Sequence, residues 1–182
     1  MKALLFVLPV ALAALLVGCA TPQVTTPVRA AVDIHQFKTA TLVVVDGVNT
    51  PFSREGLPMF EGLLKGRMQS AGYTMVDSNA QMVVEVTVNE FTPGNRALRM
   101  TVGLGAGRAL FKYTARFEDS RGNLLAELEG GKAYTGMELA DNANLKSDES
   151  IRMGLISYPV SQIGAFIGPK QFARQVRDPL AP

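Results

Sequence analysis

The sequence predicts an α+β domain in which a single mixed, mainly antiparallel sheet is covered by two helices. Three observations support this class. Apolar and polar residues alternate along two central segments, apolar residues at helical spacing follow the first strand, and a second helical pattern ends the domain. The chain has 182 residues, 47% of them hydrophobic, which suffices for one domain with a core.

The first predicted strand lies in residues 39–48, a run of β-branched and apolar residues that closes with Asp46-Gly47. A short, continuous apolar run of this kind indicates a strand that is buried on both faces.

The first helix follows this strand. Its apolar residues recur at helical spacing: Phe60, Leu63, Leu64, Met68 and Ala71. Pro58 suits a first turn, so the helix is expected to begin between Ser53 and Leu57. Gly62 and Gly66 lie four residues apart, and the pair would let the helix pack close to a sheet.

Three or four strands are expected next. Tyr73–Ser78 is short, whereas residues 81–91 alternate and place four apolar residues on one face: Met82, Val84, Val86 and Val88. The polar face of residues 81–91 favours antiparallel neighbours, and residues 108–118 alternate in the same way. Asp119–Asn123 is a hairpin turn with Gly122 at a positive φ, and the partner strand follows it.

The second helix is expected after Ser147, its candidate N-cap, with Asp148 and Glu149 in a first turn that favours acidic side chains. Its apolar stripe consists of Ile151, Leu155, Val160, Ile163 and Phe166. Pro159 lies within the stripe and is expected to kink or split the helix.

The N-terminus has the layout of a secretory signal peptide. Lys2 is followed by an apolar run that is shorter than a membrane span and is interrupted by Pro9. The end of this run and the residue after it, Leu16-Val17-Gly18-Cys19, resemble the lipobox of bacterial lipoproteins. The resemblance implies cleavage between Gly18 and Cys19 and attachment of fatty acids such as palmitate to Cys19. An uncleaved anchor with a buried cysteine is the alternative.

A lipidated Cys19 would anchor the protein, because two or more acyl chains hold a protein on a membrane far more firmly than one. Cys19 is the only cysteine, so disulfides and cysteine-based sites are excluded from the mature chain. By resemblance, Ala20 in place of aspartate favours the outer membrane, with the protein facing the periplasm. We divide the chain into a signal peptide (1–18), a tether rich in threonine and proline (19–33), a periplasmic domain (34–168) and a C-terminal tail (169–182).

Composition and motifs argue against several function classes. Lys and Arg number 18 against 16 Asp and Glu, so the net charge of +2 predicts no nucleic-acid binding. His35 is the only histidine, no G-x-S-x-G motif occurs, and neither the count nor the spacing of ligands supports a metal site. We expect no catalytic residues, no cofactor and no metal. A pair of carboxylates acting on a glycan stays open as an alternative.

One segment combines glycines with arginines. Gly103, Gly105 and Gly107 precede a strand, whereas a dinucleotide fingerprint would precede a helix. The candidate partner-binding residues are Asn95, Arg96, Arg99, Gly103, Gly105, Gly107 and Arg108. Two interpretations are open: an irregular connection with solvated arginines, or a docking edge for a protein, a lipid headgroup or a glycan.

Residues 90–127 resemble the bacterial lipoprotein family of unknown function numbered forty-four ten. The likeness is carried by motifs in matching order: Glu90-Phe91, Gly94-Asn95-Arg96, the three alternating glycines, and Asp119 with Gly122. The resemblance implies a periplasm-facing lipoprotein and no activity. More distantly, the order of elements is similar to that of the curli-secretion and penicillin-binding-protein-activator lipoproteins, which are binding modules.

We therefore expect an outer-membrane lipoprotein whose periplasmic domain binds an envelope protein and serves as an accessory in envelope assembly or maintenance. Two alternatives remain at this stage: an envelope hydrolase that acts on glycan through paired carboxylates, and a homo-oligomeric structural subunit. The first hypothesis depends on the anchor, the tether and the residue types just described.

Replacing Cys19 by serine tests the anchor. Cys19→Ser removes the only thiol that can be lipidated, so the protein is expected to leave the membrane fraction after a salt wash, whereas the parent protein stays there. The intact mass of the parent should show a chain that starts at a lipid-modified Cys19. A Cys19→Ser protein that still sediments with washed membranes would contradict the anchor.

Overall fold

A computed structural model describes residues 33–95, 97–98, 106–134 and 148–168. The elements are η2 (Ile34–Gln36), β1 (Thr39–Asp46), α2 (Pro51–Ser70), β2 (Thr74–Met75), β3 (Met82–Thr92), β4 (Ala109–Asp119), β5 (Leu124–Tyr134) and α4 (Asp148–Ile167). The strands form one sheet in the order β2-β1-β3-β4-β5. All eight elements fall within the predicted domain, and the predicted signal peptide, lipidated cysteine, tether and tail lie outside the described residues.

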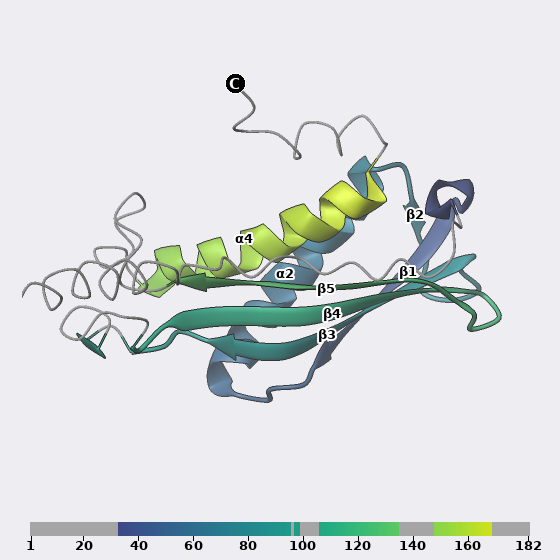
Figure 1. Cartoon of the computed structure of the whole chain (residues 1–182). Helices are drawn as coiled ribbons and strands as arrows, with labels where there is room; N and C mark the ends of the chain where they lie inside the picture. Colours follow the sequence, from purple (N-terminus) through teal and green to yellow (C-terminus); the bar gives the residue numbers. More distant parts are fainter. Residues whose placement is uncertain (1–32, 96, 99–105, 135–147, 169–182) are drawn as a thin grey trace, which may run out of the picture.

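Both helices pack on one face of this mixed sheet, which confirms the predicted α+β class (Figure 1). They run in the same direction: near their starts Arg152 of α4 contacts Glu55 of α2, and near their ends Gly164 lies against Arg67. β3 has β4 as an antiparallel neighbour but β1 as a parallel one, so the expectation of antiparallel neighbours is correct on one side only. The parallel pair is possible because α2 carries the chain back between β1 and β3.

β1 is not buried on both faces, and this prediction was wrong. Ala40, Leu42 and Val44 face the helices, whereas Val43 and Val45 are each 39% exposed on the opposite face. The apolar run suggested two covered faces. In the structure α2 and α4 both lie on the same side, so nothing among the described elements covers the other face.

α2 begins earlier than predicted. Thr50 is the N-cap and forms a capping box with Ser53, in which the Ser53 amide donates to Thr50 Oγ1 (3.1 Å) and the Thr50 amide donates to Ser53 Oγ (2.9 Å). Pro51 occupies the first turn, where the sequence predicts Pro58, and Pro58 lies inside the helix. The capping pair of Thr50 and Ser53 is the sequence pattern that marks the true start of α2, whereas Pro58 suggested a later start.

The carboxylate of Asp46 ties the end of β1 to the start of α2. It accepts hydrogen bonds from the amides of Val48 (3.0 Å) and Asn49 (2.8 Å) and from Ser53 Oγ (2.8 Å). Desolvation alone would raise the pKa of Asp46, but these hydrogen bonds and the nearby charge of Arg54 outweigh it and hold the pKa below its ordinary value. The ionised carboxylate therefore stabilises the turn that starts α2.

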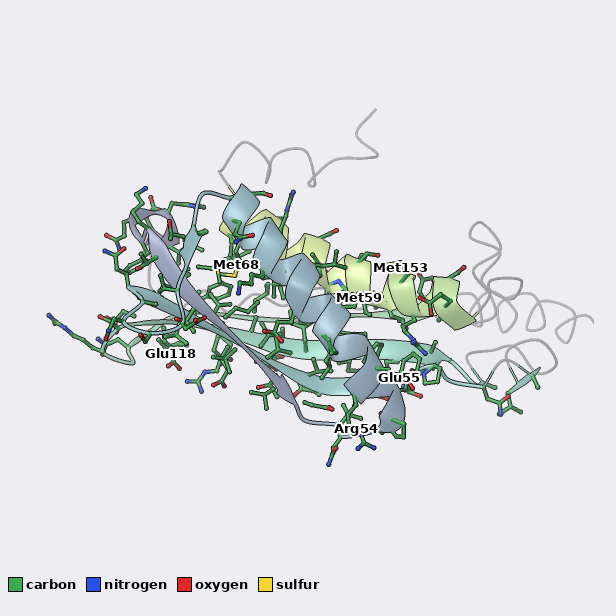
Figure 2. The ribbon with its side chains drawn as sticks, turned by 180° about the vertical axis from the view of Figure 1, so that it is seen from behind. Arg54, Glu55, Met59, Met68, Glu118 and Met153 are labelled. Carbon is green, nitrogen blue, oxygen red and sulfur yellow. The ribbon has the colours of Figure 1, made fainter. Side chains whose placement is uncertain are left out.

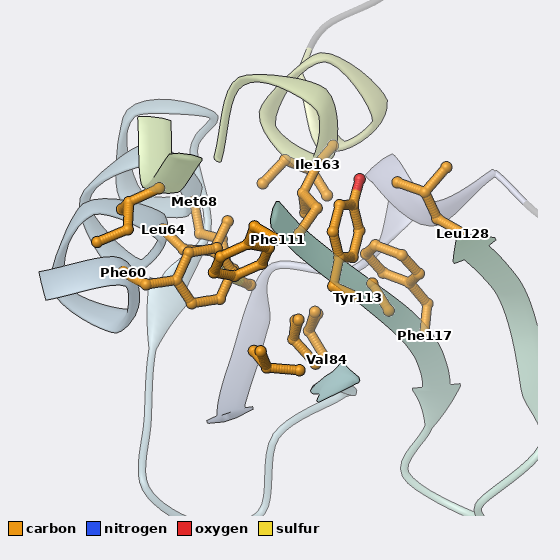
Figure 3. Packing of buried hydrophobic residues seen from close by; sticks show 14 of the residues in the cluster. Phe60, Leu64, Met68, Val84, Phe111, Tyr113, Phe117, Leu128 and Ile163 are labelled. Carbon is orange, nitrogen blue, oxygen red and sulfur yellow. The ribbon is translucent and has the colours of Figure 1, made fainter. Parts of the chain in front are cut away.

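The core lies between the sheet and the helices, and its centre is aromatic (Figure 3). The predicted alternation of β3 and β4 is confirmed, because the inward residues of both strands are buried: Met82, Val84, Val86, Val88, Phe111, Tyr113, Ala115 and Phe117. The ring of Phe111 lies 5.2 Å from that of Phe60 on α2 and 4.8 Å from that of Phe91 on β3. Such tilted and edge-to-face pairs add to the free energy of burial.

Predictions for the hairpin turn, the short second strand and the last helix have mixed outcomes. The hairpin turn is confirmed, with Gly122 at φ +79°. The short second strand is shorter than expected, since only Thr74 and Met75 pair with β1. Pro159 does not split α4, which runs continuously through it, and Ser147 lies outside the described residues. The predicted apolar stripe of α4 faces the sheet.

The glycines that bring α2 close to its neighbours are not the predicted ones. Added Cβ atoms at Gly62 and Gly66 would meet nothing within 4 Å, so that prediction was wrong. Gly56 makes the close contact instead, because a Cβ there would collide with the ring of Phe91. That ring is buried and lies against Phe52 with the centroids 4.6 Å apart.

Alanine at these positions should have opposite effects on stability. Gly56→Ala forces the buried Phe91 ring to move and is expected to lower the free energy of unfolding by about 1–3 kcal/mol. Gly62→Ala, in open space on the same helix, is the matched control and should raise it by roughly 0.5–1 kcal/mol. Urea unfolding of both variants measures the difference. Equal effects would contradict the close contact at Gly56.

Candidate interaction site

The connection between β3 and β4 is closed at its base by a backbone hydrogen bond between its two ends. The Asn95 amide donates to the carbonyl oxygen of Gly107 (2.9 Å), and the Gly94 amide donates to Thr92 Oγ1 (3.1 Å). Asn95 Oδ1 also accepts from the Leu98 amide (3.0 Å). The two ends of the connection are therefore held side by side where the strands end.

Two glycines permit this closure. Gly94 has φ +66° and Gly107 has φ +65°, the left-handed region that favours glycine. A Cβ on Gly94 would also collide with the carbonyl oxygens of Gly107 and Arg108. Gly94 is thus required both by its backbone angle and by the close approach of the opposite strand end.

The structure brings together three of the predicted binding residues. Asn95, Gly107 and Arg108 lie at the base of the connection, and the Arg108 side chain is exposed. The other predicted binding residues, which are Arg96, Arg99, Gly103 and Gly105, lie outside the described residues, as do Gly18 and Cys19. The docking-edge interpretation of this segment stays a prediction.

The sheet face that the helices leave open carries a charged surface that sequence reasoning treated only as a solvated face. Its charged residues come from β3, β4 and β5: Glu85, Glu90, Lys112, Arg116, Glu118, Glu127 and Glu129. Lys112 Nζ lies 2.9 Å from Glu90 Oε2. Arg116 contacts both Glu118 (3.1 Å) and Glu127 (3.7 Å). Five carboxylates against two cations leave this open sheet face acidic.

These ion pairs are partly or fully exposed and contribute little to the stability of the fold, about 0–1 kcal/mol each. The two carboxylates that approach each other, Glu118 and Glu127, do so through Arg116. Such a bridge is an ordinary surface network. The alternation in the sequence predicts that these residues face outward. Which of them pair across neighbouring strands is decided by the register of the sheet.

At the start of the helices, Arg152 joins α4 to α2. Its guanidinium lies 3.2 Å from Glu55 and 3.8 Å from Glu149, and it stacks 4.8 Å above the ring of Phe52. Its Nε is buried and has no hydrogen-bond partner among the described residues. This cluster fixes the two helix starts beside the β3–β4 connection.

The pKa shifts of Tyr113 and Asp119 are explained by burial and by hydrogen bonds, respectively. Burial, and to a smaller extent Tyr158, raises the pKa of Tyr113, whose hydroxyl donates to Gln162 Oε1 (3.3 Å). Hydrogen bonds from the side chain and the amide of Asn123 hold the pKa of Asp119 below its ordinary value in the exposed hairpin turn.

His35 lies in η2, and its amide donates to Asp33 Oδ1 (3.1 Å).

Within the part of the chain that the structure describes, no three His, Cys, Asp or Glu residues converge in a group suited to a metal ion. No helix in this part has the length and apolarity that a membrane span requires.

The chain is similar to one family and to several solved structures. Residues 61–136 match the family described as a domain of unknown function (DUF4410), and no curated protein matches the chain. The PelC dodecamer from Paraburkholderia phytofirmans is 16% identical, over 81% of this chain and 98% of that one, with a TM-score of 0.50. This similarity supports a shared fold.

Two lipoprotein structures have lower TM-scores. Lipoprotein GNA1162 from Neisseria meningitidis is 14% identical over 69% of this chain and 97% of that one, with a TM-score of 0.46. A minor lipoprotein from Acinetobacter baumannii is 19% identical over 76% and 93%, with a TM-score of 0.41. The expected likeness to the curli-secretion and penicillin-binding-protein-activator lipoproteins stays a prediction.

Alanine at Gly94 should open the base of the connection. Gly94→Ala is expected to cost about 1–3 kcal/mol more than Gly122→Ala, because both have a positive φ but only at Gly94 would the new Cβ meet backbone oxygens. Urea unfolding gives both values. The same cost at the two positions would show that the close approach at Gly94 contributes nothing.

Proposed function

We propose that this protein is a lipid-anchored, periplasm-facing lipoprotein of the outer membrane whose α+β domain binds an envelope protein as a non-catalytic accessory in envelope assembly or maintenance. The anchor is supported by the signal-like N-terminus and the lipobox-like residues that end in Cys19. The tether that follows gives the domain reach from the membrane surface.

The observation that carries the binding role is that the described helices cover the sheet on one side only. Two helices bury one sheet face, and the other face remains open with an organised row of charged residues. Beside it, the β3–β4 connection is held closed and presents the exposed Arg108. A charged surface next to an arginine-bearing connection suits recognition of a protein surface, where complementary charge provides specificity.

A homo-oligomeric structural subunit is a second candidate, and a separate observation favours it. The PelC protein with a similar fold is a dodecamer, so this architecture is compatible with assembly from copies of one chain. In the described part of this chain the sheet also has edges that take no further strand. The two candidates are compatible, since an assembly of copies can hold an envelope partner.

Crosslinking in intact cells tests the binding role. We expect the wild-type protein to capture an envelope protein, and Arg96→Ala with Arg108→Ala to lower the captured amount several-fold, because the connection loses two of its three arginines. Arg121→Ala is the matched control, since Arg121 is an exposed arginine in the hairpin turn at the other end of β4.

Capture that falls equally in the Arg121→Ala control would count against the β3–β4 connection as the binding surface. Capture of no envelope protein by any of the three proteins, each expressed at the same level and recovered in the membrane fraction, would contradict the binding role itself.

A further inference from the structure

The sheet has two edges at which backbone groups can accept another strand. On one side β5 is the last strand, and no described element pairs with its outer edge. On the other side β2 pairs only with Thr39 and Ala40, so residues 42–46 of β1 have a strand neighbour on the β3 side alone within the described residues. Unpaired edges of this kind are templates for pairing with another chain.

The segment of β1 at this edge lacks the devices that usually protect an edge. It consists of Leu42, Val43, Val44 and Val45, with no charge, proline or bulge. Val43 and Val45 are each 39% exposed on the open sheet face. β-Branched residues at an exposed edge have a high propensity for strand pairing, and burial of their side chains would stabilise such a pair.

The two edges run in the same direction. β1 is parallel to β3, β4 is antiparallel to β3, and β5 is antiparallel to β4, so β5 is parallel to β1. A second copy in the same orientation can therefore place its β1 beside β5 as a parallel neighbour. Repetition of this contact is head to tail, and it uses both edges of every copy.

Pairing of two β5 strands about a twofold axis is less favourable. It would bring Glu127 and Glu129 of both copies together on one face, and like charges across a strand pair are destabilising. It would also leave the apolar edge of β1 open in both copies. A β1 edge, by contrast, places the uncharged Val43 and Val45 on the same face as these carboxylates.

We propose that β5 of one copy pairs in parallel with residues 42–45 of β1 in the next copy, so that the sheet continues from subunit to subunit. The occupant of each edge is thus a second copy of this chain. The inference rests on the second candidate function, self-assembly, and adds which edges meet and in which direction.

Cysteine crosslinking distinguishes the arrangements. The lipidated full chain is prepared in detergent as two single variants, Val43→Cys and Glu129→Cys, whose new side chains both lie on the open sheet face. When the two are mixed and treated with a short thiol crosslinker, the major product is expected to be the 43–129 pair. The parent chain, treated in the same way, is the control. Thr41→Cys, Val45→Cys and Glu127→Cys, tested in the same pairwise manner, accommodate a shift in register.

A charge test uses the opposite signs of matched variants. Val43→Glu with Val45→Glu would face Glu127 and Glu129 of the neighbour and should lower the assembled fraction at least tenfold, whereas Val43→Lys with Val45→Lys should retain it. Adding Glu127→Lys and Glu129→Lys to the acidic variant should restore assembly. Within one chain, positions 43 and 129 are three strand spacings apart, about 14 Å, so rescue has to act between copies.

Light scattering on the same detergent-solubilised chain gives the mass, and circular dichroism confirms that each variant is folded. A 43–129 product together with charge rescue supports the proposal. A mass of several chains with only 129–129 products, or with no product from any edge pair, overturns the edge assignment and leaves self-assembly standing. A single-chain mass for the folded wild-type protein overturns self-assembly and this inference with it.

Discussion

The packing of one aromatic row beneath two parallel helices is the interaction on which the rest of this structure depends. Phe111 of β4 contacts Phe60 from α2 and Phe91 from β3, and the ring centroid of Tyr113, two residues farther along the same strand, lies 6.4 Å from that of Phe111. These residues are almost fully buried, so the apolar area removed from water is concentrated on one face. Both helices lie over that face and cover it.

This one-sided burial also determines which surfaces are available for binding. The helices and the aromatic row occupy one side, so the charged residues of β3, β4 and β5 line the other, and the edges of the sheet stay outside the helical layer (Figure 2). The β3–β4 connection is closed by Gly94 and Gly107 at the end of the sheet where the helices begin. The proposed binding and assembly roles both use surfaces that the core does not need.

The joint between β1 and α2 shows how a polar contact directs the apolar packing. Asp46 at the end of β1 holds Ser53 in the first turn of α2, and Gly56, one turn later, allows the helix to lie against Phe91. The Asp46 carboxylate fixes the start of α2, and from this start the helix places Phe60 against Phe111. A displacement of this turn would therefore reach the centre of the core.

The sequence by itself determined what depends on local periodicity and turn chemistry: the inward faces of β3 and β4, the Gly122 turn, the apolar stripe of α4 and the fold class. Only the tertiary structure decided which glycine of α2 is in close contact, that Val43 and Val45 face outward, and that β1 pairs in parallel with β3. The reason is physical. Alternation is fixed by neighbours in the chain, whereas burial, strand order and close approach depend on segments tens of residues away.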